Sequence, residues 1–122
     1  VVLNEQLAER FAGTGVTVHA THPGWADTPA VRSSLPRFWK LARSILRTPA
    51  QGADTVVWLA VAPEAKEQTG RLWFDREPQR THLVSWTKES VDERERLWRQ
   101  LCDWIGVDAD ADWGEREGRN DN

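Results

Sequence analysis

The fold is decided by residues 16–29, which read VTVHATHPGWADTP. The stretch before the proline is rich in β-branched residues, as short strands are. Pro23 and Gly24 then end the predicted strand sharply. Ligands of doubly wound α/β sheets lie at the carboxyl ends of strands, so this turn is a candidate binding loop. Taken by itself the signal is weak, because a Pro-Gly turn after a strand is usually only a turn.

Helical patterns flank this strand and alternate with a second one. Residues 1–12 carry apolar side chains at helical spacing, and residues 13–15 (GTG) predict a turn. Residues 71–75 (RLWFD) predict the second strand. Periodicity is weak across residues 25–47, where we expect one short helix. The order helix, strand, helix, strand, helix is typical of a parallel sheet with crossover helices.

Two further helices carry clear start signals. Thr48, Pro49 and Gln51 supply an N-cap, a proline at the first helical position and a capping-box glutamine, and this helix should end at Pro63. Residues 90–93 (SVDE) form another capping box. The apolar faces we predict are Ala53, Val56, Val57, Ala60 and Val61 on the first helix, and Val91, Trp98, Leu101, Cys102 and Ile105 on the second.

This pattern is that of an incomplete domain. Two strands cannot form a parallel sheet alone, because such sheets bury both faces. The chain has no methionine, and its first helix begins without a capping residue. We therefore expect residues 1–106 to be the C-terminal part of a larger domain whose N-terminal part lies upstream. Residues 107–122 should be an acidic tail without ordered structure.

Composition limits the function further. The 122 residues are 39% hydrophobic and 29% charged, which fits one soluble globular domain or a piece of one. No apolar run reaches the roughly 20 residues of a membrane span. Residues 1–106 are close to neutral, with no basic field that would suggest nucleic acid or an anionic membrane as a partner. A single cysteine excludes an internal disulfide and favours a cytoplasmic location.

Three other side chains have simpler interpretations than catalysis. His22 stands beside the Pro-Gly turn and could be imagined as an acid or base, but a structural histidine is the preferred interpretation. His19 is an alternating residue of the predicted strand and is interpreted as structural. Cys102 lies on an apolar helix face and is expected to be a small buried hydrophobe. One cysteine and three histidines make no finger-like or ribbon-like zinc spacing, so no metal site is predicted.

Several motifs together carry a resemblance to a known family. The string HPGWADTP after VTVHAT resembles the short-chain dehydrogenase/reductase (SDR) family, whose sixth strand ends in a Pro-Gly motif followed by a threonine. The string TPAQGADTVVWLA resembles the family's helix before the last strand, and TGRLWFDRE resembles that last strand, in the right order. VVLNEQLAERFAGTGV resembles the second half of the helix that carries the catalytic residues. The likeness covers roughly residues 1–105 and is strongest to the retinol-dehydrogenase-like branch.

The resemblance implies the C-terminal portion of a Rossmann-type doubly wound parallel sheet that binds NAD or NADP. Pro23 and Gly24 would shape the loop against the nicotinamide ring. The backbone of Ala26 would hold the carboxamide, and the Thr28 side chain would bond the carboxamide or the pyrophosphate. Residues 29–47 match the variable substrate-binding segment. Its candidate contacts with a small lipophilic substrate are Val31, Leu35, Phe38 and Trp39.

The resemblance also implies what this chain lacks. The family's Tyr-x-x-x-Lys pair, its general acid or base with the lysine that lowers the tyrosine pKa, would lie just upstream of Val1, and the chain contains no tyrosine. No catalytic residue is therefore assigned, and the chain alone should be inactive. The alternative is a non-catalytic relative that binds a nucleotide or a protein. A homo-oligomer is a further partner that the family suggests.

Overall fold

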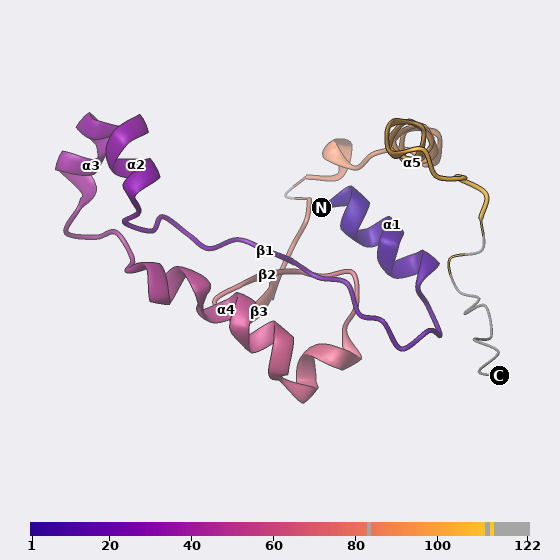
Figure 1. Ribbon diagram of the computed structural model, residues 1–122, viewed down its shortest axis with the longest axis horizontal. Helices are drawn as coiled ribbons and strands as arrows, with labels where there is room; N and C mark the ends of the chain where they lie inside the picture. Colours follow the sequence, from indigo (N-terminus) through magenta and orange to yellow (C-terminus); the bar gives the residue numbers. More distant parts are fainter. Residues whose placement is uncertain (83, 112, 114–122) are drawn as a thin grey trace, which may run out of the picture.

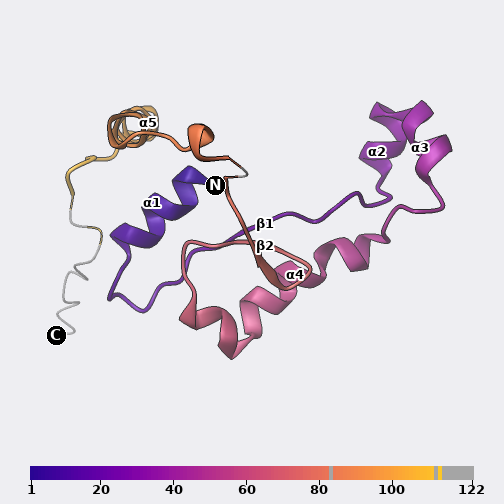
Figure 2. The same ribbon diagram turned by 180° about the vertical axis from the view of Figure 1, so that it is seen from behind.

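The computed structural model describes residues 1–82, 84–111 and 113. Helices lie on both faces of a small sheet, so the predicted mixed α/β class is confirmed (Figure 1). Within the described residues the sheet has three strands in the order β1 (Ala20–Thr21), β2 (Leu72–Phe74) and β3 (Glu77–Gln79). Seen from either side, α4 covers one face while α1 and α5 lie beyond the other (Figure 2).

The first two strands pair in parallel, as predicted, with Ala20 opposite Leu72. Strand β1 is shorter than the predicted strand, but its backbone bonds extend at both ends. The Gly70 N–H donates to the Val18 carbonyl at 2.7 Å, and the His22 N–H donates to the Trp73 carbonyl at 2.9 Å. β1 is paired on one side only among the described residues.

The sheet is mixed, because a third strand that was not predicted, β3, returns antiparallel to β2. The turn between them places Asp75 and Arg76 at φ values of 53° and 62°. Left-handed conformations at both central residues suit a tight hairpin, and Asn-Gly or Asp-Gly normally marks such turns. The Asp75-Arg76 pair lacks this signature, so the hairpin could not be predicted from the sequence.

The capping predictions were right. Helix α4 (Pro49–Val61) begins at the Thr48–Gln51 capping box, and α5 (Val91–Ile105) begins at the Ser90–Glu93 box. The first helix, α1, runs over Val2–Arg10. Short 3-10 helices add two further turns, at Pro63–Glu67 and Ser85–Thr87.

The single short helix expected within residues 25–47 is instead two helices, α2 (Pro29–Ser34) and α3 (Pro36–Ala42). They are separated at Leu35, whose backbone is non-helical (φ −130°, ψ 56°). Pro36 explains the break, because proline removes a helical N–H and disfavours the helical conformation of the residue before it.

The apolar face predicted for α4 is not buried. Gly52 and Thr55 face inward, while Val56, Val57 and Val61 are 50%, 60% and 72% exposed. Within the described chain too few strands lie alongside α4 to cover its broad apolar surface. The face predicted for α5 is partly confirmed: Trp98 and Cys102 are buried, whereas Val91 and Ile105 are exposed.

Trp73 of β2 is the centre of the core and is only 2% exposed. Trp58 of α4 packs against it edge-on at 5.2 Å between ring centroids. The Trp73 indole N–H donates to Nδ1 of His19 at 3.1 Å, so Nδ1 is unprotonated and the other ring nitrogen carries the proton of the neutral ring. Burial lowers the pKa of His19, against a smaller opposing effect from the Ala65 backbone.

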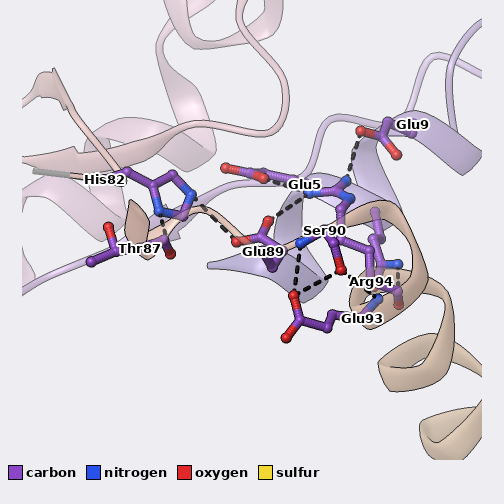
Figure 3. A network of polar contacts seen from close by, with 9 residues as sticks. Glu5, Glu9, His82, Thr87, Glu89, Ser90, Glu93 and Arg94 are labelled. Carbon is purple, nitrogen blue, oxygen red and sulfur yellow. Dashed lines mark hydrogen bonds and ion pairs between the residues drawn. The ribbon is translucent and has the colours of Figure 1, made fainter. Parts of the chain in front are cut away.

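A polar cluster around Arg94 joins α1 to α5 (Figure 3). The Arg94 guanidinium donates to Glu5 at 2.9 Å, to Glu9 at 2.8 Å and to Glu89 at 3.1 Å. His82 lies 3.5 Å from the second oxygen of Glu89. Arg94 is 18% exposed in its side chain, so water screens these ion pairs only in part.

The boundary proposed at residue 107 lies just after the α5 cap at Gly106. Residues 107–111 run back along α5, where the Trp98 indole N–H donates to the Ala109 carbonyl at 3.0 Å. Residues 112 and 114–122 of the expected tail lie outside the described residues.

Replacing Arg94 should weaken the contact between the two helices. Arg94→Met would leave Glu5 and Glu89 without their cation, and we expect the free energy of unfolding to fall by about 2 kcal/mol. Urea unfolding measures this. Arg96→Met is the matched control, because Arg96 is exposed on the same helix and has no ion pair among the described residues. Equal losses in both variants would contradict this role of the cluster.

The half-buried His19 ring predicts a pH dependence of stability. Because its folded-state pKa is below 6.5, the unfolded chain binds a proton that the folded chain excludes as pH falls through the unfolded value. The free energy of unfolding should therefore decrease as the pH falls through the unfolded-state pKa and level off below the folded-state pKa. In His19→Gln this decrease should be smaller, and identical pH profiles for the two proteins would rule the explanation out.

Candidate functional site

The loop after β1 has a shape that requires glycine. Gly24 has a φ of +72°, and its N–H donates to Nδ1 of His22 at 3.0 Å. A Cβ atom on Gly24 would lie 2.9 Å from Nε of Arg47, which real Cβ contacts do not tolerate. A side chain here would strain the left-handed backbone and would also have to displace the Arg47 guanidinium. The local hydrogen bond of His22 agrees with a structural histidine.

Arg47 holds this loop in place through its backbone. Its N–H donates to the Trp25 carbonyl at 2.9 Å, and its carbonyl accepts from the Asp27 N–H at 2.8 Å. Together the two bonds form a parallel bridge between Ala26 and Arg47. In that geometry the N–H and C=O of Ala26 point away from Arg47.

The Arg47 side chain continues the same attachment. Its guanidinium makes a two-pronged ion pair with Asp75, one prong of which is 2.6 Å long, and lies 4.7 Å from the Phe74 ring centroid. Hydrogen bonding from Arg47 lowers the pKa of Asp75. The loop after β1 is therefore fixed to the carboxyl end of β2. Sequence reasoning assigned Arg47 no role, since its partners are remote in the chain.

The four predicted cofactor residues fall in this one loop. Ala26 forms no hydrogen bond through its own N–H or C=O to any described residue, so a donor and an acceptor remain side by side. An amide such as a carboxamide needs that pair of groups. Pro23 is exposed and Gly24 half-buried. Gly52 at the start of α4 closes in from behind, where an added Cβ would lie 3.2 Å from the Cβ of Ala26.

Thr28 acts as the N-cap of α2. Its hydroxyl oxygen accepts from the Val31 N–H at 3.3 Å. A threonine hydroxyl has one donor hydrogen besides its lone pairs, so the cap leaves the O–H free to donate to a ligand. The predicted ligand role of Thr28 is compatible with the cap and stays a prediction.

Asp27 joins the loop to the two helices that follow. Its carboxylate accepts two bonds of 2.7 Å from Arg32 of α2 and one of 2.8 Å from the Trp39 indole of α3. The hydrogen bonds from Arg32 lower the pKa of Asp27. No local spacing signal in the sequence marks this contact, so a role of Asp27 could not be predicted from the sequence.

An apolar cavity of about 380 Å³ opens between the loop and α3. Of the predicted substrate residues, Phe38 lines it and packs against Trp25 at 4.8 Å between ring centroids. Trp39 instead turns to Asp27, and Val31 and Leu35 are not among the lining residues. The lining consists of His22, Gly24, Trp25, Phe38, Ala42, Ile45, Leu46, Arg47 and Phe74.

The described part of the chain has neither a metal-binding cluster nor a membrane-spanning helix. Its histidine, cysteine, aspartate and glutamate side chains nowhere gather in groups of three or more that could hold a metal ion. Among the helices described, none has the length and apolar character needed to cross a bilayer.

Comparison with known proteins agrees with the motifs. The chain is 47% identical over 95 residues to dehydrogenase/reductase SDR family member 12 of Bos taurus, an alignment covering 75% of this chain and 30% of that protein. It is 34% identical over 109 residues to retinol dehydrogenase 12 of Homo sapiens, covering 88% of this chain and 34% of the relative. With polyprenol dehydrogenase of Danio rerio the identity is 32% over 113 residues, covering 86% and 32%.

No family model matches the chain, and no solved structure matches it. The chain spans about a third of the length of the curated relatives it matches. The identities extend over most of the chain and agree with the resemblance carried by the Pro-Gly loop and the last strand. The chain is thus related to the short-chain dehydrogenase/reductase family, in its retinol-dehydrogenase-like branch.

Proposed function

We propose that this chain is the C-terminal part of an NAD(P)-dependent oxidoreductase that acts on an alcohol or carbonyl of a small lipophilic molecule. The observation that carries the proposal is the loop after β1, where Ala26 leaves an N–H and a C=O free at the carboxyl end of the sheet. The relatives named dehydrogenases or dehydrogenase/reductases support the same class of reaction.

The loop residues fit one side of a nicotinamide. In the proposal Pro23 and Gly24 form the surface against which the ring lies, and the backbone of Ala26 pairs with the carboxamide. The free O–H of Thr28 donates to the carboxamide or to the pyrophosphate. The bound nicotinamide supplies the hydride chemistry, while the protein binds and orients. Whether the cofactor is NAD or NADP depends on residues outside this chain.

The substrate would occupy the apolar cavity beside the loop. Phe38 and Trp25 supply its aromatic wall, and ligand sites of this kind are mostly apolar with few polar groups. Two of the relatives carry retinol and polyprenol, both lipophilic alcohols, in their names. Val31, Leu35 and Trp39 remain proposed contacts for a substrate that extends beyond the cavity.

Proton transfer must come from elsewhere in the whole protein. The chain has no tyrosine, so it contributes cofactor and substrate contacts but not the family's proton-transfer residue, and alone it should be inactive. The exposed valines of α4 and the one-sided pairing of β1 favour further strands beside these elements. They support residues 1–106 as part of a larger domain. We keep the cytoplasm as the proposed location.

Gly24→Ala should weaken cofactor binding in the whole protein. The new Cβ must displace Arg47 and distort the loop that presents Ala26, so we expect the dissociation constant for NADH or NADPH to rise at least about tenfold. Nucleotide fluorescence titration measures this. Gly13→Ala is the matched control: Gly13 has a similar φ of +81°, but no atom lies within 4 Å of its added Cβ. Unchanged nucleotide affinity in Gly24→Ala would contradict the proposed loop.

The coding sequence immediately upstream of Val1 tests the catalytic half of the proposal. We expect an in-frame tyrosine four residues before a lysine, on the same helix as α1. A continuous reading frame without that pair would favour the non-catalytic binding relative. A start codon directly before Val1 would remove the basis for the larger domain.

A further inference from the structure

We propose that the segment containing α2 and α3 docks on the surface of an anionic lipid bilayer. This segment, residues 28–47, is called the basic hairpin below. It stands apart from the rest of the fold, at the opposite end of the molecule from α1 and α5 in both views (Figures 1 and 2). Docking of this kind goes beyond the proposed function and needs no helix that crosses the membrane.

Large apolar side chains of the hairpin region face water. Leu41 is 87% exposed and Ile45 is 83% exposed. Leu41 lies near the end of α3, and Ile45 lies in the turn that follows the helix. Trp25, in the neighbouring loop, is 58% exposed. Tryptophan and long aliphatic side chains are the groups that enter the boundary between headgroups and acyl chains.

The charge of the same region is strongly positive. Residues 28–53 contain five arginines or lysines and no aspartate or glutamate, whereas the whole chain has a net charge of −3. Arg32 and Arg47 are paired with aspartates. Arg37, Lys40 and Arg43 are exposed and have no ion pair with any described residue. Three free cations beside exposed apolar side chains complement an anionic lipid surface.

Comparison with α4 separates this surface from one that a protein would cover. The exposed face of α4 that includes Val56, Val57 and Val61 carries no cation and suits burial against further strands. On the hairpin, Arg37 and Lys40 lie within one helical turn of Leu41. Burying these cations in a protein core would carry a large desolvation cost, whereas lipid headgroups keep them hydrated and paired.

The hairpin also borders the apolar cavity. Ile45 and Trp25 are exposed and at the same time line that cavity. A bilayer in contact with Leu41 and Ile45 would therefore lie at the cavity mouth. This arrangement gives a lipophilic molecule a path from membrane to cavity without crossing water, and that consequence rests on the proposed function. The docking itself does not depend on the proposed function.

Vesicle sedimentation of this chain tests the proposal. We expect binding to vesicles of phosphatidylcholine with about a third phosphatidylserine, weaker binding to pure phosphatidylcholine, and a decrease with added salt. The triple variant R37Q/K40Q/R43Q should bind about 100-fold more weakly, at roughly fivefold per cation. L41S/I45S should also lose at least about tenfold.

Matched controls use residues of the same kind elsewhere. R71Q/R80Q/R96Q removes three exposed cations that have no ion pair among the described residues, and V57S/V61S removes exposed apolar groups from α4. Both should bind vesicles as the parent chain does. The proposal is overturned if the parent chain ignores anionic vesicles or if the controls lose as much affinity as the hairpin variants. Lower melting temperatures of the hairpin variants would identify a packed protein interface instead. Cofactor affinity, tested through Gly24, is independent of these outcomes.

Discussion

The attachment made by Arg47 is the constraint on which the candidate site depends. Its backbone bridges Ala26 and its guanidinium reaches Asp75, so one residue joins the loop after β1 to the end of β2. A side chain at Gly24 would strain its left-handed backbone and would have to displace that guanidinium. Arg47 bonds to the Trp25 carbonyl and the Asp27 N–H on either side of Ala26, so the free N–H and C=O of Ala26 are a consequence of the same bridge. The shape of the proposed cofactor surface thus depends on Arg47, a residue outside the Pro-Gly motif.

Local signals predicted much of the fold. Both capping boxes predict the helix starts correctly. Their hydrogen bonds join residues only three apart, so the motif can be recognised in the sequence. The antiparallel β3 and the break at Leu35 were not predicted. Strand β3 depends on left-handed backbone at Asp75 and Arg76, and these two residue types do not indicate that conformation. The break at Leu35 is caused by Pro36, but the weak apolar periodicity of residues 25–47 was interpreted as one helix. The face of α4 was misjudged because burial depends on neighbours, which periodicity cannot count.

The candidate site, like the fold, could be predicted only in part from the sequence. Pro23, Gly24, Ala26 and Thr28 could be proposed because the string that contains them resembles a motif of a known family, and the structure places them in one loop. Asp27 was overlooked although it accepts bonds from both α2 and α3. Its partners are set by the fold of the hairpin, so no spacing rule applies to it. The residues that shape the loop are therefore harder to find from sequence than those that could touch a ligand.

Net charge shows why a sum over a chain can mislead about partners. Residues 1–106 are nearly neutral, which by itself suggests no attraction to an anionic surface. Exposed charges act over a screening length of about 8 Å at physiological salt, so a surface responds to the cations nearest to it and not to the total. On the hairpin the nearest charges are all positive, and the acids that balance them lie on other elements. Arg32 and Arg47 are neutralised by their aspartates, which leaves Arg37, Lys40 and Arg43 to set the local field. The positions of the charges in the fold, and not the net charge, therefore decide whether this surface attracts an anionic partner.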